Sequence, residues 1–222
     1  MIIQCYDDGV GAVELVDHMG NDKRAVDAAR VSFMRDNTAA DLVDKDKRLI
    51  KFLVTHQHTS PFEHMVATVR ITCPLFVRSQ IMRHRTFSFN EVSRRYTSEN
   101  IRYWRPSHLR EQSSKNLQCS AGELAGELGD NAIRLIDELV NSINTVYEVL
   151  IDLGVTREQA RAVLPQSTYT SFYMTGNLHN WSKFLRLRTD EHTQPETREI
   201  AEAIQAILTR LYPVTMSSFQ LG

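Results

Sequence analysis

Very little cysteine and no long apolar run limit the classes of protein to which this sequence can belong. Its 222 residues include three cysteines, Cys5, Cys73 and Cys119, and none of them stands in a C-x-x-C pair. That number and spacing argue against a disulfide framework and a structural zinc site, and they favour a reducing compartment. No apolar stretch approaches the roughly 20 residues that span a bilayer. The first residues also lack the basic and apolar regions of a signal peptide. We therefore expect a cytoplasmic protein.

The sequence also lacks net charge and a dinucleotide fingerprint. Its 26 lysines and arginines oppose 27 aspartates and glutamates, so the formal net charge is −1. Nothing in this balance predicts binding to a nucleic-acid polymer or to an anionic membrane. The stretch Gly9-Val10-Gly11 lacks the third glycine of G-x-G-x-x-G. A dinucleotide bound here would therefore not be held as in a Rossmann fold.

Hydrophobic periodicity predicts helices and strands that do not alternate regularly. The clearest element is a long amphipathic helix over residues 128–153, in which apolar residues recur every three or four positions and which Gly154 ends. Further helices are predicted over 22–33, 44–56, 75–84, 196–212 and from the capping residue Asn177 to Leu187. Strands are predicted over 1–6, 12–17, 65–73 and 168–175. This order favours a single α+β domain over residues 1–222, with an antiparallel sheet flanked by helices.

The fourteen residues 83–96 carry the densest group of chemically active side chains. They read RHRTFSFNEVSRRY, with four arginines, a histidine, two serines, an asparagine and a glutamate. Arginine offers a permanent charge and a planar fork of donors that fits phosphate, while Phe87, Phe89 and Tyr96 can stack on a ring or simply pack. The stretch therefore suits a phosphorylated, planar heterocycle. Composition alone also allows a solvated basic loop, the more common case, or an RNA-binding module.

The order of these residues resembles the signature of the flavin-dependent thymidylate synthases. Arg-His-Arg, seven residues and then Ser93 match their RHR-x7-S motif, and Ser88, Asn90 and Arg95 match its wider form. The similarity covers most of the chain, through the segments AARVS at 28–32, HQHTSPFEH at 56–64, ARAVLP at 160–165 and FLRLR at 184–188, followed by His192 and Gln194.

The resemblance implies an activity and its co-substrates. In this family, dUMP is methylated to dTMP, with methylenetetrahydrofolate as the carbon donor and NADPH-reduced FAD as the hydride source. The protein would contribute binding, orientation and electrostatics while the cofactor carries the redox chemistry. The family also forms homotetramers whose flavin sites lie between subunits, so the site residues need not converge within one chain.

The resemblance also assigns roles to particular residues. Arg188 matches the arginine set against the uracil ring, where it favours the ionised, activated pyrimidine; a fixed guanidinium would stabilise the charge that develops as C5 becomes nucleophilic. The positions that match dUMP-binding residues are Gln80, Arg83, Glu91, Ser93, Arg94, Arg95, Arg161 and Arg188. Those that match FAD-binding residues are His58, Ser60, Glu63, Arg83, His84, Arg85, Thr86, Asn90, Glu91, Asn177, His179 and Lys183. His179 and Lys183 replace an arginine and an asparagine of some relatives, but both can still donate to phosphate or ribose.

Other kinds of site find less support in the sequence. Cys5 and Cys73 fall in strand-like segments, and Cys119 has no neighbouring histidine or arginine, so no thiol is predicted to act as the nucleophile. His56, His58 and His64 lack the carboxylates or cysteines of a strong ligand set, and no metal is predicted. A flavin oxidoreductase of another kind remains an alternative on the same scaffold. Residues 107–131 show little resemblance to the family and have no predicted role.

Overall fold

A five-stranded antiparallel sheet in the order β1-β2-β3-β7-β4 forms the centre of the molecule. The computed structural model describes residues 1–32, 34 and 41–220. The strands of the sheet are β1 (Ile2–Gln4), β2 (Ala12–Met19), β3 (Val66–Pro74), β7 (Tyr169–Asn177) and β4 (Ser88–Glu91). The predicted α+β class, with an antiparallel sheet flanked by helices, is confirmed.

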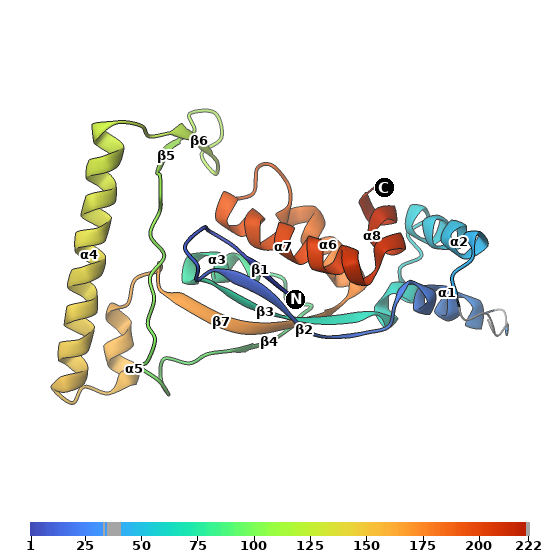
Figure 1. Cartoon of the computed structure of the whole chain (residues 1–222), viewed down its shortest axis with the longest axis horizontal. Helices are drawn as coiled ribbons and strands as arrows, with labels where there is room; N and C mark the ends of the chain where they lie inside the picture. The colour runs from blue at the N-terminus through green and yellow to red at the C-terminus, as the bar shows by residue number, and fades with distance from the viewer. Residues whose placement is uncertain (33, 35–40, 221–222) are drawn as a thin grey trace.

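Helices cover one face of this sheet and extend beyond both of its ends (Figure 1). Helices α6 (Leu178–Arg188) and α7 (Pro195–Leu211) lie along the face, and α3 (Leu75–Ile81) packs between α7 and the strands. At one end, α1 (Asp22–Val31) and α2 (Asp44–Thr55) pack with the C-terminal helix α8 (Pro213–Gln220). None of the described helices combines the length and the apolarity needed to cross a membrane.

The other end of the molecule holds the long helix α4 (Glu127–Asp152), drawn in yellow, beside the short α5 (Arg157–Ala160) (Figure 1). The predicted helix over 128–153 is therefore confirmed to within one residue at each end. A small hairpin of β5 (Arg110–Gln112) and β6 (Ser120–Glu123) precedes α4. Two 3-10 turns, η1 (Ser60–His64) and η2 (Arg161–Val163), precede β3 and β7.

Along the middle of β3 and β7, every second side chain is apolar and points to the helix-covered face of the sheet, where it is buried. Val69 lies opposite Met174 and Ile71 lies opposite Phe172, and all four side chains are buried. Directly opposite residues of an antiparallel pair share a face, so these pairs stack in one apolar layer. Arg70, between Val69 and Ile71, is exposed on the opposite face.

An aromatic cluster fastens the segment before β4 to helix α6. The Phe87 ring lies 4.6 Å from the Trp181 ring and 6.1 Å from the Phe184 ring, centroid to centroid, with near-perpendicular planes. The Trp181 indole also donates to the Ala67 carbonyl of β3 at 3.4 Å. Gly176 leaves room for this packing, because a Cβ atom there would lie 2.4 Å from the Phe87 ring.

The structure adds elements that the sequence patterns do not predict. β4 lies in a segment without clear periodicity and exists through its pairing with β7. α8 begins directly after α7, and its N-terminus is capped by the buried Asp22 carboxylate, which accepts from the backbone N–H groups of Val214 and Thr215 at 2.9 and 2.8 Å. The helix predicted over 75–84 ends at Ile81. Phe33, the predicted end of the first helix, lies outside the described residues.

Replacing Gly176 by alanine should lower the free energy of unfolding by about 1–3 kcal/mol, the usual cost of overpacking a core. The Phe87 ring cannot move away easily because Trp181 and Phe184 hold it. The control is Gly122→Ala, where an added Cβ meets nothing within 4 Å and where we expect a change within about 0.5 kcal/mol. Denaturant titration followed by tryptophan fluorescence measures both. Equal midpoints for the two variants would contradict this packing argument.

Candidate active site

The Arg-His-Arg segment forms the turn that joins α3 to β4. The turn closes through backbone bonds from Arg83 to the Gln80 carbonyl at 3.3 Å and from His84 to the Ile81 carbonyl at 3.1 Å. Because Phe87 is held in the core, the turn presents Arg83, Arg85 and Thr86 to solvent and leaves His84 half-buried. Helix α6 supports it from the other side, where the Asn180 amide donates to the Thr86 carbonyl at 3.2 Å.

Arg188, at the end of α6, lies directly against this turn. Its Nε donates to His84 Nε2 at 3.0 Å, and its Nη2 donates to the Gln80 carbonyl at 3.1 Å. Arg188 is half-buried while Arg186 is exposed, so the two arginines face different directions, as their spacing predicts. Three of the five N–H donors of the guanidinium remain for a ligand.

The His84 imidazole is a neutral acceptor in this contact. Burial, and to a smaller extent the charge of Arg188, lower its pKa from 6.5 to about 4. Because the pKa of His84 is lower in the folded chain than in the unfolded chain, protonation of His84 opposes folding. The free energy of unfolding is therefore highest, as far as His84 is concerned, above about pH 6.5, and it decreases as the pH falls toward 4. The Arg188–His84 bond therefore stays intact around neutral pH.

Arg95 and Arg161 meet at a second position, beyond the end of β4. The Arg95 guanidinium lies 3.3 Å from the Glu158 carboxylate, and Arg161 Nε donates to the Glu158 carbonyl at 3.4 Å. All three side chains are exposed. Arg95 can exchange the exposed Glu158 carboxylate for a phosphate, and Arg161, which contacts only the backbone of Glu158, keeps further donors for the same phosphate.

The remaining predicted dUMP residues follow β4 or lie on it, and the protein already uses several of their polar groups. Glu91 accepts from Arg78 Nε at 3.1 Å and from Thr170 Oγ1 at 2.8 Å, so both its oxygens are engaged. Ser93 Oγ accepts from the Arg95 backbone at 3.3 Å. Arg94 donates to the Glu99 carbonyl at 2.7 Å, which turns its guanidinium toward the next loop.

Arg78 is a residue of this site that the sequence analysis does not identify. It pairs with Glu91 and is half-buried on α3. The two residues are separated by 13 positions, a helix end and a turn. No local spacing rule connects such positions, so only the fold reveals the pair.

Three of the predicted FAD residues, Asn177, His179 and Lys183, lie at the start of α6, and η1, which holds Ser60 and Glu63, packs against this helix. Asn177 caps the helix by accepting from the Asn180 backbone at 2.9 Å, which confirms its predicted capping role. Burial, and to a smaller extent the charge of Lys183, lower the pKa of His179, while the charge of Glu63 in η1 opposes the shift. His58 and Ser60 lead into η1, and Asn90 is exposed on β4. Cationic and amide donors at a helix N-terminus suit a pyrophosphate, and a carboxylate suits a ribose hydroxyl, so the donor set fits FAD.

The structure does not join all predicted substrate residues within one chain. Arg188, His84 and Gln80 form one group, and Arg95 and Arg161 form another. No hydrogen bond or ion pair links the two groups in the part of the chain that the structure describes.

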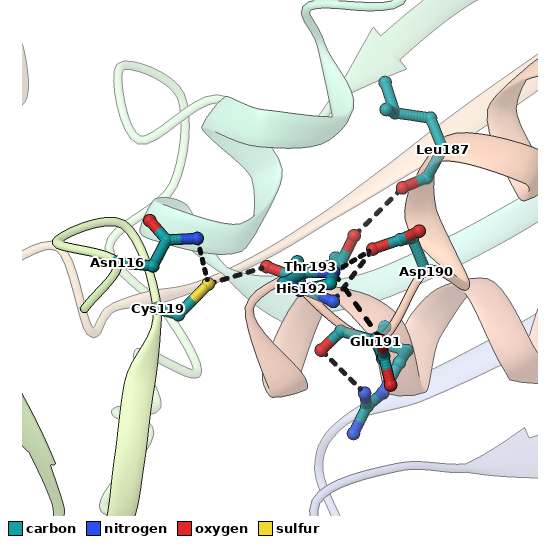
Figure 2. Close-up of polar contacts among 8 residues, drawn as sticks. Asn116, Cys119, Leu187, Asp190, Glu191, His192 and Thr193 are labelled. Atoms are coloured by element: carbon teal, nitrogen blue, oxygen red, sulfur yellow. Dashed lines mark hydrogen bonds and ion pairs between the residues drawn. The ribbon is translucent and has the colours of Figure 1, made fainter. Parts of the chain in front are cut away.

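A cavity of about 420 Å³ lies between the β5–β6 hairpin and the start of α7. Two of its lining residues meet in Figure 2, where Cys119 Sγ accepts from the Asn116 amide at 3.1 Å and lies 3.7 Å from the His192 carbonyl. All predicted site residues lie in the described part of the chain, and none of them lines this cavity. Gln194 and Glu196 do line it. Gln194 is hydrogen-bonded both to Gln80 and to Glu196, so the cavity wall is connected to one predicted residue.

The cysteines have poor nucleophilic settings. Burial raises the pKa of the Cys5 thiol to about 12 and raises that of Cys73 as well, so both stay protonated at neutral pH. Cys119 is half-buried and hydrogen-bonded in the hairpin. A thiolate is the reactive form of cysteine, so the buried pair does not supply one.

Exposed arginines beside a helix N-terminus, held on one antiparallel sheet, are what an enzyme that binds phosphorylated nucleotides would present. Comparisons with known proteins make this class specific. Residues 14–214 match the model of the family described as "Thymidylate synthase complementing protein". The chain is 41% identical to a flavin-dependent thymidylate synthase of Thermosipho melanesiensis, over 94% of this chain and 90% of that one. It is 40% identical to that of Thermus thermophilus, over 95% and 76%.

A solved structure supports the same assignment. The UMP/dUMP methylase PolB from Streptomyces cacaoi, bound with 5-Br dUMP, superposes with a TM-score of 0.85 at 34% identity, over 94% of each chain. The chain belongs to the flavin-dependent thymidylate synthase family, which methylates dUMP to dTMP with FAD.

Replacing Arg95 by alanine should weaken dUMP binding by roughly ten- to a hundred-fold, because it removes a charge-assisted contact to phosphate. FAD should remain bound. The control is Arg105→Ala, since Arg105 is an exposed arginine that pairs with Asp137 and Asn141 on α4 instead. Calorimetric titration of the FAD-loaded protein measures both. A dUMP affinity unchanged in Arg95→Ala would remove this residue from the phosphate site.

Proposed function

We propose that this chain methylates dUMP through a site in which Arg95 and Arg161 hold the phosphate and Arg188 acts on the uracil ring. Gln80, Arg83, Glu91, Ser93 and Arg94 complete the proposed substrate set. The observation that carries the proposal is the fixed Arg188 guanidinium, which α3 and the Arg-His-Arg turn hold by two hydrogen bonds.

We propose that three segments of the chain bind FAD. They are His58, Ser60 and Glu63 before β3; Arg83, His84, Arg85, Thr86, Asn90 and Glu91 around β4; and Asn177, His179 and Lys183 at the start of α6. When bound, FAD supplies the hydride, with methylenetetrahydrofolate as the carbon donor and NADPH as the reductant. The exposed arginines and Lys183 would bind the pyrophosphate and orient the nucleotide.

The chemistry of the chain itself centres on Arg188. Burial lowers the pKa of this guanidinium, yet an arginine remains cationic at any working pH, so it does not serve as a base. Its role is to stabilise negative charge on the pyrimidine as C5 becomes nucleophilic. Because neutral His84 fixes the guanidinium, little reorganisation is needed when that charge develops.

The rate of dTMP formation by the FAD-loaded protein, with dUMP, methylenetetrahydrofolate and NADPH, tests the function and this role together. The unmodified protein should form dTMP. Arg188→Ala should lose turnover by about 10²–10³, because a donor that acts on developing charge affects the rate more than binding. Arg186→Ala is the matched control, two residues away and exposed.

Flavin bleaching by NADPH shows that each variant is folded and loaded, since reduction of the cofactor does not need an activated uracil. Absence of dTMP with the unmodified protein would exclude the function and leave another flavin oxidoreductase. Full turnover by Arg188→Ala would exclude only the role of Arg188.

We further propose a homotetramer, with α4 in a subunit interface. Along this helix Leu128, Leu135, Leu139, Val146 and Val149 are 71%, 62%, 58%, 48% and 49% exposed. An exposed apolar stripe of this length usually packs against another helix. We also propose that the chain forms a single domain and that the protein is cytoplasmic. The free cysteines favour the cytoplasmic location, because thiols stay reduced there.

Light scattering should report four chains of 25.5 kDa for the FAD-loaded protein. The double variant Leu135→Glu with Leu139→Glu should dissociate, because it places charge in the apolar stripe. Arg134→Glu changes the net charge by the same amount on an exposed position of α4 and should leave the tetramer intact. An active, FAD-loaded monomer would contradict the proposed assembly.

A further inference from the structure

We propose that Glu196 sets the orientation of the Gln80 amide through Gln194, and that this orientation makes the site select uracil over cytosine. The inference rests on the proposed function, which includes Gln80 in the dUMP set and puts Arg188, hydrogen-bonded to the Gln80 backbone, on the uracil ring. Glu196 and Gln194 would thus be positioning residues, and Gln80 the residue that reads the ring.

Four side chains form a continuous chain of hydrogen bonds. Arg110 Nη2 donates to Glu196 Oε1 at 2.7 Å, and Gln194 Nε2 donates to Glu196 Oε2 at 2.9 Å. Gln80 Nε2 then donates to Gln194 Oε1 at 2.5 Å. The members come from the β5–β6 hairpin, the start of α7 and α3, and Glu196 is only 7% exposed.

The Glu196 carboxylate, between Arg110 and Gln194, determines the direction of every bond. A carboxylate paired with an arginine can only accept hydrogen bonds, so Gln194 must turn its NH₂ group toward Glu196. The Gln194 oxygen then faces Gln80, and only the NH₂ group of Gln80 can meet it. An amide alone could point either way, but this chain of bonds fixes both amides.

The consequence is that Gln80 keeps its Oε1 for a ligand. Among the described residues, no donor bonds to this oxygen, and Gln80 is half-buried next to Arg188, which donates to its backbone carbonyl. In neutral uracil N3 carries a hydrogen, whereas in cytosine N3 carries a lone pair. An oxygen at this point pairs with uracil and repels cytosine. Gln80 would recognise the neutral ring on binding, and Arg188 would act on the charge that develops afterwards.

The substitution Glu196→Gln should reverse the direction of these bonds. Arg110 can donate only to the oxygen of the new amide, so its NH₂ group would face Gln194. Gln194 would then present its oxygen to residue 196 and its NH₂ group to Gln80. Gln80 would accept that bond and turn its own NH₂ group toward the ring, where it suits the N3 lone pair of cytosine.

The test measures the dissociation constants of dUMP and dCMP for the FAD-loaded protein by calorimetry. The unmodified protein should prefer dUMP. Glu196→Gln should weaken dUMP binding by about ten- to a hundred-fold and strengthen dCMP binding, because one good pair is exchanged for one mismatch. A variant that is merely loosened would lose affinity for both nucleotides by a similar factor.

Glu199→Gln is the matched control, because it makes the same chemical change three residues along α7. Glu199 accepts from the Tyr6 backbone and takes no part in the chain of bonds, so the dUMP-to-dCMP preference should stay as in the unmodified protein. Gln194→Met cuts the chain without reversing it. This variant should bind dUMP less tightly and should not bind dCMP more tightly than the unmodified protein does. It replaces Glu196→Gln as the test of the inference if Glu196→Gln does not retain FAD.

The inference would be overturned if Glu196→Gln kept the unmodified preference for dUMP over dCMP. If Glu196→Gln does not retain FAD, the same outcome in Gln194→Met would overturn it. Equal binding of the two nucleotides by the unmodified protein would overturn it as well. In those cases dTMP formation from dUMP would still stand. Failure to bind dUMP at all would instead refute the proposed function.

Discussion

The packing of helix α6 on the central sheet is the interaction on which the rest of the site depends. Trp181 and Phe184 anchor the helix between β3 and the Phe87 ring, and all three aromatic side chains are buried or nearly so. The same packing therefore positions the Arg-His-Arg turn. With 11 residues, α6 is about 16 Å long. It carries His179 and Lys183 in its first half and Arg188 at its end, so one rigid element positions both proposed FAD residues and the residue proposed to act on the pyrimidine.

Electrostatics are arranged locally in a protein whose net charge is close to zero. Three arginines of the site have partners of different kinds: neutral His84 for Arg188, the half-buried Glu91 carboxylate for Arg78 and the exposed Glu158 carboxylate for Arg95. A neutral partner leaves the charge of Arg188 uncompensated, which suits an anionic transition state. An exposed carboxylate can be displaced by phosphate, whereas the half-buried Glu91 pair is held by Thr170 as well. These three environments fit the separate roles proposed for Arg95 in binding and for Arg188 in activation, and they leave Arg78 a structural one.

The β5–β6 hairpin belongs to residues 107–131, which carry no recognisable motif, yet it contacts residues next to the site. Arg110 reaches Glu196, and Cys119 lies against the carbonyl of His192, so the hairpin holds the loop before α7 from two points. Gln80 is in turn tied to that loop through Gln194. Side chains distant from the substrate can orient a ligand-facing amide when every bond between them has only one allowed direction.

The sequence by itself determined the α+β class, the long helix α4, the capping role of Asn177 and the family, because periodicity, caps and an ordered motif are local properties of the chain. It also separated Arg188 from Arg186, since residues two apart on a helix cannot share a face. Only the tertiary structure decided the rest. β4 is a strand because β7 lies beside it, α8 begins where Asp22 can cap it, and Arg78 and Arg110 belong to the site because of partners 13 and 86 positions away. The physical reason is that a hydrogen bond or ion pair depends on distance in space, and no pattern within the chain encodes which distant residues the packing of the core will bring together.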